Sequence, residues 1–183
     1  MKKLFLFTIL LLAAVSAYAQ GRGNVFVTNS TDCDVYVDVK AVCPECTEYS
    51  SLAMWHIPPH PTWPGIHLYD ASLQWPNPYW ASATDPQVTC FNQWEWSHVE
   101  LDFFCGGNSY KVFVGNEFSP CHNYPKTVML TSEPVEPADP NDPEWVPQIY
   151  IPQSCLDECF NGNPIYVKWI HNTTGNIHIT IGI

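Results

Sequence analysis

The sequence predicts an all-β protein: an antiparallel β-sandwich of immunoglobulin-like or jelly-roll-like type, crosslinked by disulfides and carrying a long Pro/Trp-rich loop. Apolar residues alternate with polar ones in several segments, which is the pattern of half-buried strands. We find no window of the mature chain with a helical stripe of apolar residues. An export signal precedes eight cysteines, so we expect the thiols to pair in an oxidising compartment.

The export signal is residues 1–19. Lys2 and Lys3 precede an apolar run over residues 4–15, and Ala17 and Ala19 place small residues where a signal peptidase cleaves. We therefore expect a signal peptide at 1–19 and one secreted domain at 20–183, in the periplasm or outside the cell. No second apolar run is long enough to cross a bilayer, so no membrane insertion is expected after signal removal.

The charge balance restricts the partners. Without Lys2 and Lys3, the chain keeps five basic residues against 18 acidic ones, a net charge of −13. Nucleic acid is excluded as a partner because phosphate binding needs clustered Lys and Arg. Cations, neutral glycans and basic extracellular proteins remain as ligand classes.

Strands are predicted from alternation, in pairs separated by turn-rich sequence. Each pair is expected to form a hairpin: residues 24–28 with 35–40, 99–103 with 110–114, and 165–170 with 177–183. Weaker strands are expected at 66–69, 88–91, 127–130 and 148–151. The last strand is so apolar on one face that it must lie inside a sheet.

Two stretches interrupt the strands and are predicted to be long surface loops. Residues 54–80 are rich in proline, tryptophan and histidine, and residues 133–147 are acidic and proline-rich. Loops of this length are usually functional or mobile.

The cysteines are expected to form four disulfides, whose pairing the sequence leaves open. They are Cys33, Cys43, Cys46, Cys90, Cys105, Cys121, Cys155 and Cys159. A small local loop would join Cys155 to Cys159, whereas Cys33 and Cys43 flank one strand and should pair elsewhere. A redox Cys-x-x-Cys at 43–46 or a zinc site with nearby histidines is disfavoured, because the chain lacks the alternating strands and helices of thioredoxin-like proteins and export oxidises thiols.

No cofactor is expected, and calcium is the one alternative. Asp139, Asn141, Asp142 and Glu144 offer hard oxygen ligands in a short loop. The prolines and the missing glycine depart from helix-loop-helix calcium sites, so a solvated acidic linker is the preferred interpretation. Asp34 and Asp38, on one strand face, are interpreted as a solvated sheet face.

Catalytic motifs are absent from the sequence, so no enzyme is predicted. Glu95, Glu100 and Asp102 could act as paired carboxylates, with Glu100 and Asp102 on one strand face. A small carboxylate-dependent glycoside hydrolase is therefore kept as an alternative.

The tryptophans give the leading functional hypothesis. Trp55, Trp63, Trp75 and Trp80 lie in the Pro-rich stretch, and flat rings on a stiff loop suit sugar rings, prolines or cations. We predict a secreted, non-catalytic module that binds a glycan or an extracellular protein. A structural or adhesive extracellular component is another alternative. Trp94, Trp96 and Trp169 are assigned to the core. Asn29 and Asn172 match the N-glycosylation pattern in turns.

Overall fold

The computed structural model describes a large part of the 183-residue chain. The described residues are 25–50, 55–59, 62–63, 66–67, 71–75, 95–116, 121–135, 137–138, 142, 145–172 and 176–182. The predicted signal peptide, the predicted strand at 88–91, and the side chains of Trp80, Cys90 and Trp94 lie outside them.

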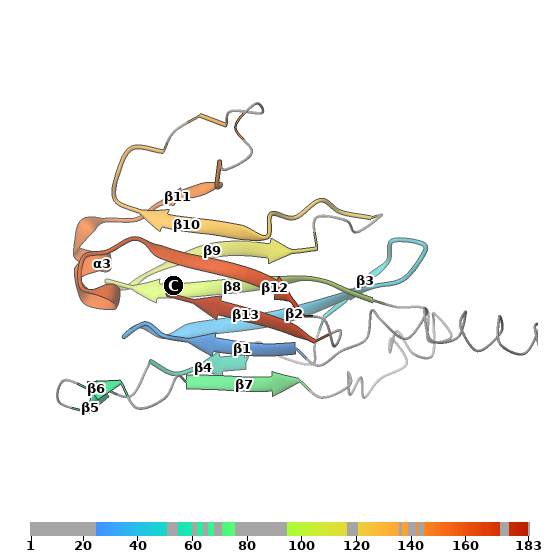
Figure 1. Cartoon of the computed structure of the whole chain (residues 1–183), viewed down its shortest axis with the longest axis horizontal. Coiled ribbons are helices and arrows are strands. Elements are labelled where there is room, and N and C mark those ends of the chain that lie inside the picture. The colour runs from blue at the N-terminus through green and yellow to red at the C-terminus, as the bar shows by residue number, and fades with distance from the viewer. Residues whose placement is uncertain are drawn as a thin grey trace, which may run out of the picture.

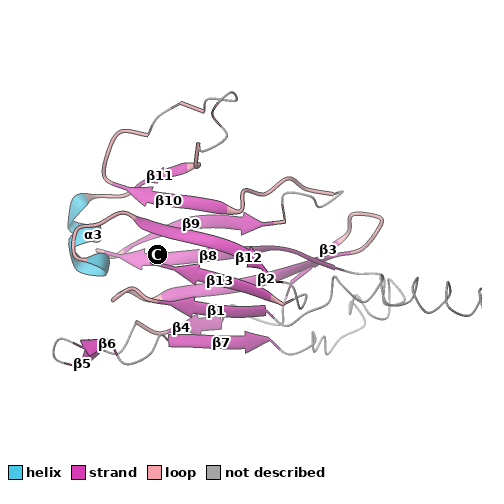
Figure 2. Ribbon diagram, in the orientation of Figure 1, coloured by secondary structure: helices cyan, strands magenta, loops and turns pink. Residues whose placement is uncertain are grey.

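Nearly all of the described regular structure is β, in two main sheets (Figures 1 and 2). The six-stranded sheet has the order β11 (Gln148–Tyr150), β10 (Thr127–Thr131), β12 (Ile165–His171), β13 (Ile177–Ile181), β1 (Val25–Asn29) and β7 (Ala71–Trp75). The five-stranded sheet has the order β3 (Glu48–Ser50), β2 (Val35–Val42), β8 (Glu95–Cys105) and β9 (Asn108–Gly115), and β4 (Trp55–Ile57) also pairs with β2. A small separate ribbon joins β5 (Thr62–Trp63) to β6 (Ile66–His67).

The predicted alternation produces the core. Val35, Val37 and Val39 of β2 are fully buried, and the residues between them are more exposed. β1 and β13 show the same pattern. Buried side chains from both sheets belong to one hydrophobic core, which also contains Trp96 and Trp169, as predicted. Burying a side chain such as valine stabilises the fold by about 1.5–3 kcal/mol.

Two of the three predicted hairpins are confirmed. β8 pairs antiparallel with β9, and β12 with β13. The β8–β9 turn places Gly106 and Gly107 at φ 55° and 78°. Two consecutive residues with positive φ make the turn that matches the twist of a two-residue hairpin, and glycine adopts it without a steric cost. The weaker strands predicted near 127–130 and 148–151 are also present, as β10 and β11.

The predicted N-terminal hairpin is wrong. β1 belongs to the six-stranded sheet and pairs with β13 in parallel, whereas β2 belongs to the other sheet. The connection is held by the buried Asn29, whose Nδ2 donates to the carbonyls of Cys33 (2.8 Å) and Pro58 (3.1 Å). Asn29 Oδ1 accepts hydrogen bonds from the backbone and hydroxyl of Thr31. The turn-rich residues therefore form a buried crossover between sheets.

The purely antiparallel arrangement is also wrong, because β10 pairs in parallel with β11 in addition to the β1–β13 pair. The prediction of one long loop at 54–80 fails for four segments, because β4, β5, β6 and β7 lie within it. β4 joins β2, and β7 joins β1 with Trp75 opposite Val25 in register. In the second predicted loop, residues 133–135, 137–138 and 142 have no regular structure and are exposed.

One helix was not predicted, α3 (Gln153–Phe160). It ends at Asn161, which adopts the left-handed conformation typical of a helix C-terminus. Its buried residues, Cys155, Leu156 and Cys159, lie on one side at helical spacing. At eight residues, α3 is too short to show a long helical stripe of apolar residues in the sequence. Within the described residues, no helix is long and apolar enough to cross a bilayer.

The disulfides join segments that adjoin different sheets. Cys33 bonds Cys159 and Cys105 bonds Cys155, so α3, which lies between β11 and β12, is tied to the five-stranded sheet. The predicted local loop from Cys155 to Cys159 is therefore wrong, and the prediction that Cys33 pairs with another element is confirmed.

A third bridge, Cys46–Cys121, links the β2–β3 turn to the segment before β10. In Figure 1, the β2–β3 turn lies toward the end of the sheets opposite α3. Cys43 is also disulfide-bonded, and none of the described cysteines is free. Cys46 pairs with Cys121 and not with Cys43, so the Cys-x-x-Cys sequence is not a redox dithiol pair. Disulfides of this kind persist in an oxidising, extracellular-type environment.

Candidate functional site

The five-stranded sheet has one face toward the core and one away from it. Because Val35, Val37 and Val39 point into the core, the residues between them point outward. We call this second surface the outer face. It consists of Tyr36, Asp38 and Lys40 of β2, His98, Glu100, Asp102 and Phe104 of β8, Ser109, Lys111 and Phe113 of β9, and His56 of β4.

The strand register arranges these side chains in rows across the sheet. One row reads Tyr36, Asp102 and Lys111 from β2 through β8 to β9. The next reads Asp38, Glu100 and Phe113, and a third reads Lys40, His98 and Gly115. Neighbours within a row are close enough for their side chains to interact directly.

One end of the outer face carries a cluster of three rings. Tyr36 stacks on His56 with ring centroids 4.9 Å apart and meets Phe104 edge-on at 5.1 Å. His56 Nε2 contacts Asp34 Oδ1 at 2.5 Å. Phe104 is 41% exposed, and the Asp34 side chain is 49% exposed. We call Tyr36, His56 and Phe104 the aromatic cluster; it is an accessible apolar surface beside a carboxylate.

Carboxylates occupy the middle of the outer face. Asp38 lies directly opposite Glu100, and Lys40 Nζ bridges them at 2.7 and 3.6 Å. Burial by itself lowers the pKa of Lys40, but its hydrogen bonds and attraction to Asp38 and Glu100 outweigh burial and raise the pKa. This lysine therefore stays charged and holds the two carboxylates together.

Asp102 has a separate set of partners. Its Oδ1 accepts a hydrogen bond from Ser109 Oγ (3.2 Å) and lies 3.4 Å from Lys111 Nζ. Glu100 and Asp102 thus share one face of β8, as the sequence predicted, and each meets a different lysine. At the end of β8, burial raises the pKa of Glu95.

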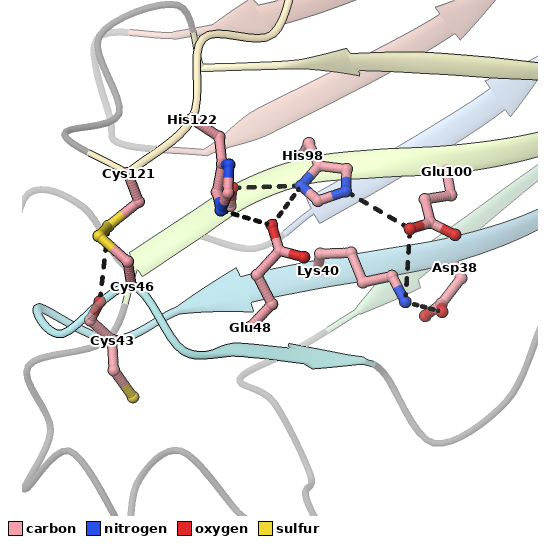
Figure 3. A network of polar contacts seen from close by, with 10 residues as sticks. Asp38, Lys40, Cys43, Cys46, Glu48, His98, Glu100, Cys121 and His122 are labelled. Atoms are coloured by element: carbon pink, nitrogen blue, oxygen red, sulfur yellow. Dashed lines mark hydrogen bonds and ion pairs between the residues drawn. A yellow bond between two sulfur atoms is a disulfide. The ribbon is translucent and has the colours of Figure 1, made fainter.

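The other end of the outer face carries a histidine cluster (Figure 3). His98 Nδ1 lies 3.7 Å from Glu48 Oε1, and the same oxygen lies 3.2 Å from His122 Nε2. On its other side, His98 Nε2 lies 3.6 Å from Glu100 Oε1. Glu48 comes from β3 and His122 from the segment after Cys121, so three separate parts of the chain build this cluster.

His98 is covered by Tyr124, whose ring stacks on it at 3.9 Å, and only 1% of the His98 residue is exposed. Gly115 allows this close approach: a Cβ there would lie 2.6 Å from His98 Cβ and 2.9 Å from Tyr124 Cβ. The burial of His98 could not be recognised from its position in an alternating strand.

Burial dominates the proton chemistry of this cluster. Burial lowers the pKa of His98 from 6.5 to about 4. The positive charges of Lys40 and His122 lower this pKa further, whereas the negative charges of Glu48 and Asp38 raise it. The contacts of His98 with Glu48 and Glu100 are therefore not ion pairs near neutral pH. Burial, Glu48 and Glu100 raise the pKa of Tyr124.

The predicted ligand-binding tryptophans are only partly within the described residues. Trp55 lies in β4 opposite Val37 and is 42% exposed. Because strand residues alternate, Trp55 points to the opposite side of the sheet from His56. Trp63 and Trp75 are described in backbone only, as residues of β5 and β7, and Trp80 lies outside the described residues.

The structure places few of the predicted metal ligands. Asp142 is exposed, while Asp139, Asn141 and Glu144 lie outside the described residues. Among the side chains that are described, no group of three His, Cys, Asp or Glu residues is arranged to hold a metal ion. His56, one of the histidines near the Cys-x-x-Cys sequence, contacts Asp34.

The two glycosylation candidates differ. Asn29 is fully buried with its Nδ2 bonded to two carbonyls, so the expectation of an exposed acceptor there is wrong. Asn172 is partly buried, and its Nδ2 lies 3.2 Å from His178 Nε2.

Comparison with known proteins gives no further guide. No protein-family model, no curated protein and no solved structure matches the chain.

Proposed function

We propose that the mature chain is a secreted, non-catalytic binding module built as a β-sandwich, and that its ligand surface is the outer face of the five-stranded sheet. The immunoglobulin-like or jelly-roll-like type stays a prediction. Two sheets with one shared core, crosslinked by disulfides, support the sandwich and the oxidising location.

The aromatic cluster is the observation that carries this proposal. Tyr36 contacts both His56 and Phe104 on the outer face, and the three rings remain partly or well exposed. Exposed rings in contact are a common way to bind ligands by stacking. Because the rings stand on paired strands, little conformational entropy is lost when a ligand binds.

The cluster also connects the sheet with the Pro/Trp-rich stretch. His56 belongs to β4, which lies inside residues 54–80 and pairs with β2. We propose that the tryptophans of this stretch, Trp55, Trp63, Trp75 and Trp80, form a second contact surface apart from the outer face, since Trp55 points to the opposite side of the sheet from His56 and Trp75 belongs to β7 of the six-stranded sheet.

Binding can be tested with a panel of soluble neutral oligosaccharides and charged peptides, measured by calorimetry. We expect one ligand class to bind, and Tyr36→Ala or Phe104→Ala to weaken it by about 1–3 kcal/mol, in the range of a lost stacking contact. Tyr150→Ala is the matched control, since Tyr150 is an exposed ring at the edge of the other sheet.

Thermal melting of each variant separates lost binding from lost folding. Equal affinity of the folded Tyr36→Ala, Phe104→Ala and Tyr150→Ala variants would remove the outer face as the ligand surface. Failure of the whole panel to bind would favour the structural or adhesive alternative.

A further inference from the structure

We propose that the ligand of the outer face is a positively charged, extended segment of a partner protein, bound through Lys or Arg side chains. This inference rests on the proposed function and names the class of partner. It is carried by the pairing of rings with carboxylates along β8.

Each of three neighbouring rows combines a ring and a carboxylate. Tyr36 lies opposite Asp102, and Phe113 lies opposite Glu100. The third row, beyond Tyr36, pairs the Phe104 ring with the Asp34 carboxylate. These two residues are neighbours across the strands, because the backbone N–H of Phe104 donates to the carbonyl of Asp34 at 3.1 Å. A ring face attracts a cation, and an adjacent carboxylate neutralises it, so a ring beside a carboxylate suits a guanidinium or an ammonium group.

The net charge of the outer face favours a cation over a neutral sugar. Five carboxylates lie on or beside it, against two lysines: Asp34, Asp38, Glu48, Glu100 and Asp102 against Lys40 and Lys111. The whole mature chain has the same sign of charge, with 18 acidic residues against five basic ones. The negative electrostatic field of such a surface accelerates the approach of basic partners.

The placement of Asp38 opposite Glu100 supports the same conclusion. Two like charges directly across a strand pair destabilise a sheet. Lys40 offsets part of this repulsion, but it is mostly buried and shared between both carboxylates. The Glu100 side chain remains 31% exposed, so an external cation can approach it.

The spacing of the rows identifies an extended peptide in preference to a single small cation. Phe104, Asp102 and Glu100 are alternate residues of one strand, so successive rows lie about 7 Å apart. Alternate side chains of an extended partner chain repeat at the same distance. A segment with a basic residue at every second position would place one cation over each row.

The test uses the mature, disulfide-bonded protein and a labelled peptide that alternates arginine with serine, measured by fluorescence anisotropy. We expect binding that weakens as salt is added, because exposed charge pairs are screened. Glu100→Gln and Asp34→Asn should each weaken it about two- to fivefold, the range for exposed ion pairs. Glu133→Gln is the matched control, since Glu133 is exposed and lies after β10, in the other sheet.

The outcomes separate the two proposals. Equal weakening by Glu100→Gln and Glu133→Gln would show that only overall acidity attracts the peptide, and would overturn the inference. Binding of a neutral oligosaccharide that depends on Tyr36, with no binding of the arginine peptide, would also overturn it and would leave the proposed function standing. Binding of neither probe would count against both.

Discussion

Acidification should destabilise this protein through one residue, His98. Burial lowers the His98 pKa in the folded chain from the ordinary 6.5 to about 4. The unfolded chain therefore binds the proton more tightly than the folded chain does, and stability falls as the pH falls. The contribution of His98 is complete above pH 6.5 and is lost progressively down to pH 4.

The size of the effect follows from the same shift. Each pKa unit corresponds to about 1.4 kcal/mol, so the full loss below the folded pKa is about 3 kcal/mol. Between about pH 7.5 and about pH 5, the linkage relation gives a loss of about 2 kcal/mol from this group. That is a large fraction of the stability of an ordinary domain.

The assay is urea denaturation of the wild type and of His98→Gln at both pH values. We expect the wild type to lose about 2 kcal/mol more than the variant over this interval, whatever the variant's stability near neutral pH. His171→Gln is the matched control, because His171 is exposed on β12, and it should behave as the wild type does.

An equal loss in the wild type and His98→Gln would refute the reasoning. If the variant does not fold, proton titration of the wild-type His98 ring by nuclear magnetic resonance replaces it. A His98 pKa near 6.5 in the folded protein would then show that the ring is not desolvated as the structure indicates.

Three further changes test the packing. Gly115→Ala should cost about 1–3 kcal/mol in urea denaturation, because its methyl group would overlap His98; an unchanged midpoint would contradict the tight stack. Removing the Cys46–Cys121 bridge with two alanines should lower stability by about 2–5 kcal/mol in thermal melting, since it closes a long loop with a sequence separation of 75 residues. Asn29→Ala should cost about 1–3 kcal/mol, because the hydrogen bonds from the buried Asn29 amide to the Cys33 and Pro58 carbonyls are lost, and wild-type stability would argue against this crossover.

The strands with a clear period of two could be predicted, because burial of one face requires apolar residues at every second position. β2, β12 and β13 are examples, and their buried positions are the predicted ones. Strand pairing is harder to predict, since alternation shows which face is buried but not which neighbour a strand meets. The turn at Asn29 looks like a hairpin turn in sequence, yet its side chain bridges to Pro58, 29 residues away.

The outer face was only partly predictable for the same reason. Asp34 and Asp38 were interpreted as solvated; Asp34 is 49% exposed, but for Asp38 the prediction is wrong, because its side chain is only 13% exposed and pairs with Lys40. Glu100 and Asp102 were recognised as sharing a face. The burial of His98, however, depends on Tyr124, which lies between β9 and β10, three residues after the disulfide-bonded Cys121. No local pattern around residue 98 signals a contact made so far along the chain.

The disulfides restrict how the protein can change shape when it binds a ligand. Cys33–Cys159 and Cys105–Cys155 tie α3, which lies between two strands of the six-stranded sheet, to the five-stranded sheet, and Cys46–Cys121 ties the β2–β3 turn to the connection between β9 and β10. Shear, in which one packed layer slides over the other, is a common route by which proteins adjust to a ligand. The two bridges to α3 oppose that motion, so the outer face should bind a ligand with little change of shape, and reduction of these bridges should allow the layers to slide.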